Sequence, residues 1–192
     1  MSPETQILLV RHGETEWSLS GQHTSRTDLP LTENGRRRAA PLRGALAKRT
    51  FALVLTSPLR RARETCELAG FCDRAEVCED LCEWDYGAYE GLTTPQIRET
   101  NPDWNLWRDG CPGGESPDQV GVRADRVIER LRGAGGEGLA FAHGHFLRVV
   151  TARWLQMPVT AGARFVFIPG AIGTLGFERE TEVILGWNAA PE

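Results

Sequence analysis

The sequence lacks an excess of basic residues. Its 192 residues contain 22 Lys and Arg against 26 Asp and Glu, which leaves a net charge of −4 at pH 7. Because broad nucleic-acid binding usually requires a basic patch, we expect no nucleic-acid partner. No apolar run approaches the roughly 18 residues of a membrane span, and residues 1–6 lack the pattern of a secretory signal. We therefore expect a cytoplasmic protein with no membrane partner.

Cysteine and histidine are few and are not spaced as metal ligands usually are. The five cysteines, an odd number without a Cys-x-x-Cys pair, are Cys66, Cys72, Cys78, Cys82 and Cys111. No two of the four histidines lie four residues apart, the spacing that helical zinc sites use. We expect unpaired thiols, no metal and no cofactor. The hydrophobic share of 41% and charged share of 25% are ordinary globular values, and residues 1–192 are expected to form one domain.

Short apolar runs alternate with helical patterns along the chain. Buried strands are predicted at residues 7–10, 52–55 and 139–142, and weaker ones at 75–78, 165–168, 174–177 and 183–185. Helices are predicted at 32–48 with a break at Pro41, at 57–68, after Thr94-Pro95, at 116–132, and from about 146 to 155. The helices at 57 and 116 open on Ser-Pro, a capping residue followed by proline. This alternation predicts a layered α/β fold with a mostly parallel sheet.

Imidazole and guanidinium groups follow the three strongest strands. The first strand ends in Arg11-His12-Gly13 and the third in His143-Gly144, while Arg60 and Arg61 lie in the first turn of the helix after the second. Ligands of parallel sheets bind at the carboxyl ends of the strands, so these groups are expected to meet there. Cations are unfavourable near a helix N-terminus unless an anion is held nearby.

This combination suits a phosphoryl group. Guanidinium forks match its oxygens and stabilise its charge during transfer, and a histidine can act as the nucleophile. Gly13 and Gly144 directly follow His12 and His143, which leaves room for a ligand near the backbone.

Four segments together resemble the histidine phosphatase (phosphoglycerate mutase-like) superfamily: LLVRHGETEW, SPLRRARETCEL, LCEWDYGAYEGLT and FAHGHFLR, between Ile7 and Trp154. The resemblance implies a three-layer α/β/α fold with His12 as the phosphorylated nucleophile. It also implies a phosphate pocket of Arg11, Arg61 and His143, with Glu83 as the proton donor. Further phosphate contacts are expected from Ser18, Thr24 and Gly144.

The resemblance favours a phosphatase over a mutase. Cofactor-dependent mutases carry extra basic residues in a longer insert, whereas Thr93 to Glu115 is short and offers only Arg98 and Arg108; Ser18 stands where mutases commonly have asparagine. The segments GETEWSLSGQHTSRTDLPLTENG and WNLWRDGCPGGES are similar to fungal sedoheptulose-1,7-bisphosphatases and bacterial acid phosphatases. They imply metal-independent hydrolysis of a small phosphate ester, sugar (bis)phosphates included. A cofactor-dependent phosphoglycerate mutase and an inactive phosphate-binding module are the alternatives, and a homodimer is left open.

The segment at about 84–115 is expected to cover the pocket as a lid. Its aromatic residues are expected mainly to pack the lid against the sheet, and they are Trp84, Tyr86, Tyr89, Trp104 and Trp107. Two alternatives are open for Arg108, which either reaches a distal anion or pairs with Asp103 or Asp109. His145 is expected to cap the helix that follows it.

Overall fold

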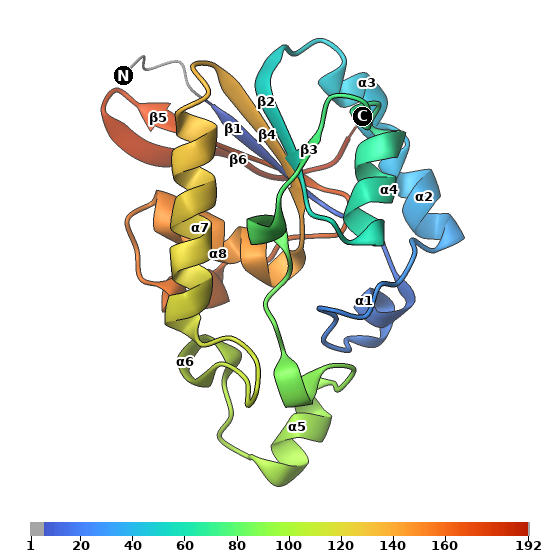
Figure 1. The fold of residues 1–192 in the computed structure, drawn as a ribbon, viewed down its shortest axis with the longest axis vertical. Helices are drawn as coiled ribbons and strands as arrows, with labels where there is room; N and C mark the ends of the chain where they lie inside the picture. The colour runs from blue at the N-terminus through green and yellow to red at the C-terminus, as the bar shows by residue number, and fades with distance from the viewer. Residues whose placement is uncertain (1–5, 192) are drawn as a thin grey trace.

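A computed structural model describes residues 6–191 of the chain (Figure 1). Six strands form one sheet in the order β3-β2-β4-β1-β5-β6, and their bounds are β1 Ile7–Arg11, β2 Phe51–Thr56, β3 Glu76–Val77, β4 Glu137–Ala142, β5 Ile172–Glu178 and β6 Thr181–Ala189. β3, β2, β4 and β1 run parallel, while β5 and β6 form an antiparallel hairpin at one edge. The predicted mixed α/β fold with a mostly parallel sheet is confirmed.

Eight α-helices surround the sheet: α1 Glu16–Ser20, α2 Glu33–Ala39, α3 Leu42–Leu46, α4 Arg60–Leu68, α5 Thr94–Thr100, α6 Leu106–Asp109, α7 Pro117–Arg132 and α8 Gly144–Trp154. Short 3₁₀ turns lie at Glu79–Leu81, Gly87–Tyr89 and Val159–Arg164. The break expected at Pro41 separates α2 from α3. No helix within residues 6–191 has both the length and the apolar character needed to cross a membrane.

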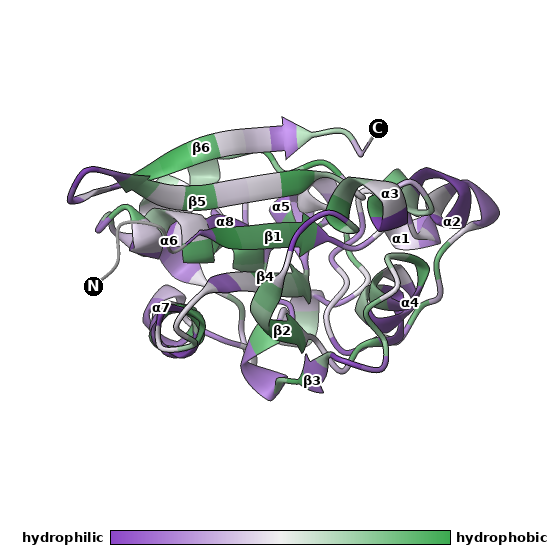
Figure 2. Cartoon of the chain, turned by 90° about the horizontal axis from the view of Figure 1, so that it is seen from above, coloured by the Kyte–Doolittle hydropathy of each residue, from purple (hydrophilic) through white to green (hydrophobic). Residues whose placement is uncertain are grey.

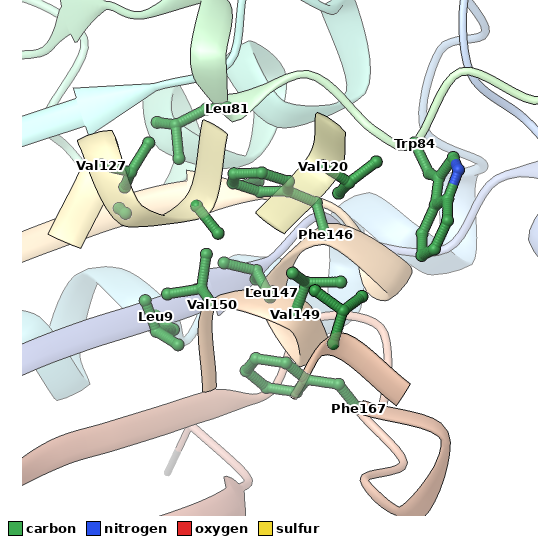
Figure 3. Packing of buried hydrophobic residues seen from close by; sticks show 14 of the residues in the cluster. Leu9, Leu81, Trp84, Val120, Val127, Phe146, Leu147, Val149, Val150 and Phe167 are labelled. Carbon is green, nitrogen blue, oxygen red and sulfur yellow. The ribbon is translucent and has the colours of Figure 1, made fainter. Parts of the chain in front are cut away.

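Helices cover both faces of the sheet, and β1 shows why (Figure 2). Successive side chains of a strand point to opposite faces. Ile7 and Leu9 belong to one buried cluster, which α7 and α8 complete (Figure 3), whereas Leu8 and Val10 belong to a second cluster with α2, α3 and α4. A strand buried on both faces needs the continuous apolar run that the sequence has here.

The strand predicted at 165–168 is wrong. This stretch is irregular and lies on the face of the β5–β6 hairpin, with the Phe167 ring 4.4 Å from that of Trp187. β5 pairs with β1 on one side and with β6 on the other, so the stretch does not join the sheet beside β5. Its backbone bonds to side chains instead: Ile168 N donates to Asn188 Oδ1, and Val166 O accepts from Trp187 Nε1.

Two helices also differ from the prediction. α4 begins at Arg60 instead of Pro58: the Ser57 hydroxyl is hydrogen-bonded to Nε2 of His143 at 2.7 Å and accepts from the Leu59 N–H at 3.3 Å, and no side chain caps the helix itself. α1 is a short helix that was not among the predicted ones, and Thr15 and Ser18 form a capping box at its N-terminus.

Candidate active site

The residues that follow β1 and β4 at their carboxyl ends line a cleft of about 440 Å³, and the carboxyl end of β2 lies beside β4. β1 and β4 are neighbours with Arg11 opposite Ala142, which puts His12 and His143 side by side with ring centres 5.2 Å apart. Arg61 enters from the first turn of α4, and its Nε donates to His143 Nδ1 at 3.1 Å. The structure therefore brings together four of the five groups that the strand ends indicated, whereas Arg60 is exposed and pairs with Glu64 at 2.6 Å.

His12 lines the cleft as a neutral imidazole. Its Nδ1 lies 2.6 Å from the carbonyl oxygen of Gly13, which only accepts hydrogen bonds, so Nδ1 carries the proton. Burial, and then the charges of Arg61 and Arg11, hold the pKa of His12 well below its usual value. The unprotonated nitrogen is therefore Nε2, whose lone pair is available as a nucleophile.

Arg61 and His143 lie behind His12, fully buried and outside the cleft lining. Because Nδ1 of His143 accepts from Arg61, its Nε2 carries the proton and donates to the Ser57 hydroxyl at 2.7 Å. The Arg61 Nη groups donate to the backbone oxygens of residues 24, 25 and 27 at 3.1 Å each. Glu90 fixes this loop, since its carboxylate accepts from the backbone N–H of Ser25 and of Thr27.

Arg11 lines the cleft with an unsatisfied donor. Its Nη1 donates to the Phe167 carbonyl, whereas its buried Nε has no protein partner among the described residues. Gly144 allows this position, because a Cβ there would lie 3.0 Å from the Arg11 Cζ. A buried N–H without a partner costs free energy, and an anion in the cleft would satisfy it.

Glu83 lies at the N-terminus of α8 and lines the cleft. Its carboxylate accepts from the backbone N–H of Trp84 at 3.0 Å, of His145 at 3.0 Å and of Phe146 at 2.8 Å. Arg123 of α7 supports the segment from behind: it donates to backbone oxygens of residues 80, 82 and 83 and pairs with Glu115 at 2.7 Å. The Glu83 carboxylate and its backbone are thus held by hydrogen bonds, and Glu83 lines the same cleft as His12.

Of the remaining predicted residues, two line the cleft and one does not. Ser18 and Thr24 line the cleft, but the Ser18 hydroxyl is hydrogen-bonded to the backbone of Thr15 and the Thr24 hydroxyl donates to Gln22 O. Arg108 lies outside the cleft lining and pairs with Asp109 at 2.6 Å, which decides between its two alternatives.

The cleft lining also includes His145, whose predicted role was wrong, and Arg148, which the sequence did not indicate. His145 does not cap α8; its ring Nδ1 lies 2.6 Å from the Tyr86 hydroxyl, and burial lowers its pKa well below the usual value. Trp104 and Trp107 are buried and line the same cleft, so they both pack and shape it. Arg148 lines it too, and the only signal in the sequence was its place one helical turn after Gly144. No three His, Cys, Asp or Glu side chains of residues 6–191 are grouped to hold a metal ion.

Comparison with known proteins agrees with this geometry. The model of the histidine phosphatase superfamily (branch 1) matches residues 7–190. The chain belongs to this superfamily. This histidine phosphatase is 44% identical to an acid phosphatase of Mycobacterium tuberculosis, over 97% of the chain and 95% of the relative. It is 38% identical to the sedoheptulose 1,7-bisphosphatase of Saccharomyces cerevisiae, over 80% of the chain and 69% of the relative.

A solved structure of a Mycobacterium tuberculosis open reading frame superimposes with a TM-score of 0.92 at 42% identity, over 98% of this chain and 99% of that one. Both of the curated relatives above are phosphatases. The comparisons thus support a phosphatase over a mutase.

Proposed function

We propose that this histidine phosphatase hydrolyses small phosphate monoesters through a phosphohistidine at Nε2 of His12, without a metal or cofactor. The observation that carries the proposal is the neutral His12 imidazole, with Nδ1 held by Gly13 and two guanidinium groups nearby. The neighbouring cations disfavour protonation of the imidazole and stabilise the negative charge of a phosphoryl group bound to it.

In the first step, the lone pair of Nε2 forms a bond to phosphorus as the bond to the ester oxygen breaks. Arg11 lies in the cleft and binds the phosphoryl oxygens, where its unsatisfied Nε gains a partner, while the positive charge of the buried Arg61 behind His12 stabilises them from a greater distance. His143 holds the Arg61 guanidinium through the Nδ1 contact and so acts as a positioning residue.

Glu83 is the group we assign to proton transfer. It lines the cleft with His12 and gives a proton to the departing alkoxide. It then takes a proton from the water that attacks the phosphohistidine, which releases inorganic phosphate and restores Nε2. The first step breaks the bond from phosphorus to the ester oxygen and the second breaks the bond from phosphorus to Nε2, and the proton that Glu83 gives in the first step returns to it in the second.

The cleft favours a small metabolite as substrate. Its volume of about 440 Å³ and its mixture of aromatic and polar walls suit a ligand of sugar phosphate size. The two phosphatase relatives support the same class. We also keep a cytoplasmic location as a proposal, supported by five free cysteines.

The test is phosphate release in the presence of EDTA from a panel of an aryl phosphate, alkyl phosphates and sugar phosphates. We expect release that His12→Ala abolishes. Glu83→Gln should slow alkyl esters at least about a hundredfold, but an aryl ester much less, because an aryl oxide leaves without a proton. Glu67→Gln, an exposed carboxylate outside the cleft, is the matched control and should leave both rates unchanged.

Two results would contradict the proposal. Hydrolysis that persists in purified His12→Ala would remove His12 as the nucleophile. Equal losses on aryl and alkyl esters in Glu83→Gln would place the proton donor elsewhere.

A further inference from the structure

The guanidinium of Arg123 is committed to the main chain around Glu83. Its Nη1 donates to Asp80 O at 2.7 Å and to Cys82 O at 2.9 Å, and its Nη2 donates to Glu83 O at 3.4 Å. Its Nε and Nη2 also donate to the Glu115 carboxylate, at 2.7 Å each. These five hydrogen bonds are as many as a guanidinium has N–H groups, so Arg123 fixes the main chain that leads to Glu83.

Glu115 fixes the main chain that follows Glu83. Its Oε2 accepts from the Asp85 N–H at 2.9 Å, and its own N–H donates to Asp85 O at 2.9 Å. Its carbonyl oxygen accepts from Nε1 of Trp84 at 3.0 Å. The side chains of Arg123 and Glu115 are only 13% and 20% exposed, and their two-point ion pair joins the two sets of contacts. We call this pair the Arg123–Glu115 clasp.

The same guanidinium contacts the helix end that binds the Glu83 carboxylate. Its Cζ lies 4.6 Å from the centre of the Phe146 ring. The backbone N–H of Phe146 donates to Oε1 of Glu83 at 2.8 Å, and that of Trp84 donates to the same oxygen at 3.0 Å. Among the described residues, Oε2 accepts from the His145 N–H alone, at 3.0 Å. Oε1 therefore has two donors, and Oε2 is the oxygen with a lone pair left for a transferred proton.

The contribution of Arg123 is geometric. It lies outside the residues that line the cleft, so it does not contact a bound ester, and Glu115 balances its charge. Its contacts instead decide where the backbone of Glu83 lies relative to the N–H groups at the start of α8. Such a placement matters, because a shift of about 1 Å in a reacting group can cost about a hundredfold in rate.

We propose that Arg123 and Glu115 are positioning residues for proton transfer, which hold Oε2 of Glu83 towards the leaving oxygen of the ester. In the first step the Oε2–H bond breaks and the proton goes to the departing alkoxide; in the second, Oε2 takes a proton from the attacking water. The inference rests on the proposed function, in which Glu83 is the proton donor. Loosening the clasp should slow the esters whose leaving group needs a proton and spare those whose leaving group does not.

The test measures kcat/KM for an alkyl phosphate and for an aryl phosphate and reports the alkyl-to-aryl ratio. The fraction of correctly folded enzyme cancels in this ratio, and a general structural defect lowers both values alike. Arg123→Gln should lower the ratio about tenfold, because a displaced Glu83 protonates the alkoxide less often. The inhibition constant of inorganic phosphate should stay within about twofold of the wild type, because the phosphate pocket keeps its residues.

Conservative variants test the geometry of the clasp. Arg123→Lys keeps the charge but not the planar fork, so its ratio should lie between those of Arg123→Gln and the wild type. Glu115→Gln keeps an acceptor for the Asp85 N–H and should lower the ratio about threefold. Both variants also serve if Arg123→Gln does not fold. Arg126→Gln is the matched control: Arg126 lies on the same helix and binds the Asp80 side chain at 2.9 Å, so its loss should leave the ratio unchanged.

A double mutant shows whether Arg123 acts through Glu83. In the Glu83→Gln enzyme the proton donor is already gone, so adding Arg123→Gln should not lower the ratio further. Fully additive effects would overturn the proposal, and so would a ratio that Arg123→Gln lowers less than twofold while Glu83→Gln lowers it strongly. A wild-type ratio in Glu83→Gln itself would instead refute the proton donor of the proposed function. The two failures are therefore distinguishable in one data set.

Discussion

Acidification should destabilise the fold through three buried imidazoles. His12, His143 and His145 each have a pKa held well below the usual value, with burial as the largest cause. In the unfolded chain the same groups titrate near a pKa of about 6.5. Below that pH the unfolded chain therefore binds more protons than the folded one, and the free energy of unfolding falls as the pH falls.

The magnitude follows from that difference. A group that is neutral in the folded state and has a pKa of about 6.5 when unfolded loses about 1.2 kcal/mol between pH 7 and pH 5.5. Three such groups lose about 4 kcal/mol, a large part of the 5–15 kcal/mol that typically stabilises a protein, and His23, whose pKa burial also lowers, adds to the loss. The salt-bridged carboxylates, such as Asp80, act in the same direction but only nearer their own unfolded pKa of about 4. The window from pH 7 to pH 5.5 thus isolates histidine.

The assay is urea unfolding followed by tryptophan fluorescence at pH 7.0, 6.2 and 5.5 and constant ionic strength. With an m-value of about 2 kcal/mol per molar, the midpoint should fall by about 2 M. His145→Gln should reduce the acid-induced loss by about 1.2 kcal/mol. Tyr86→Phe, which removes the phenolic partner of His145 but keeps every imidazole, should leave the acid-induced loss unchanged. A midpoint that stays constant down to pH 5.5 would refute the reasoning.

Two further predictions concern residues that shape the phosphate pocket. Gly144→Ala would place a Cβ 3.0 Å from the Arg11 Cζ, so kcat/KM should fall at least about tenfold as the guanidinium is displaced; Gly44→Ala, where the added Cβ meets open space, should not change it, and equal activities would contradict the close packing. Glu90→Gln weakens the hold on the loop that binds Arg61, so the inhibition constant of inorganic phosphate should rise several-fold, whereas exposed Glu99→Gln should leave it as it is. An unaltered constant in Glu90→Gln would show that the loop holds its shape without the carboxylate.

The sequence predicted the parts of the fold that depend on local pattern. The runs at 7–10, 52–55 and 139–142 are the centres of β1, β2 and β4, because only a strand buried on both faces needs continuous apolar residues. Arg11 and His12 come at the end of β1, so the same pattern places them where the carboxyl ends of the parallel strands meet.

What the sequence did not predict depends on partners distant in the chain. The residues of 165–168 suit a strand, yet β5 takes the place beside β1, and the backbone of 165–168 bonds to the side chains of Trp187 and Asn188 instead. Ser57 suits a helix cap, yet its hydroxyl is shared between His143 and the Leu59 N–H, and the helix begins only at Arg60. Arg148 gave no signal of its own, because its exposure to the cleft depends on how α8 packs against Trp107.

The central claim is that His12 carries the phosphoryl group, and the most direct measurement traps it. The enzyme is mixed with a labelled aryl phosphate in EDTA, quenched within the first turnovers, and digested for mass spectrometry. The account predicts one phosphorylated histidine, in the peptide that contains His12, and no label in His12→Ala. Label on another residue, or label retained in His12→Ala, would contradict it.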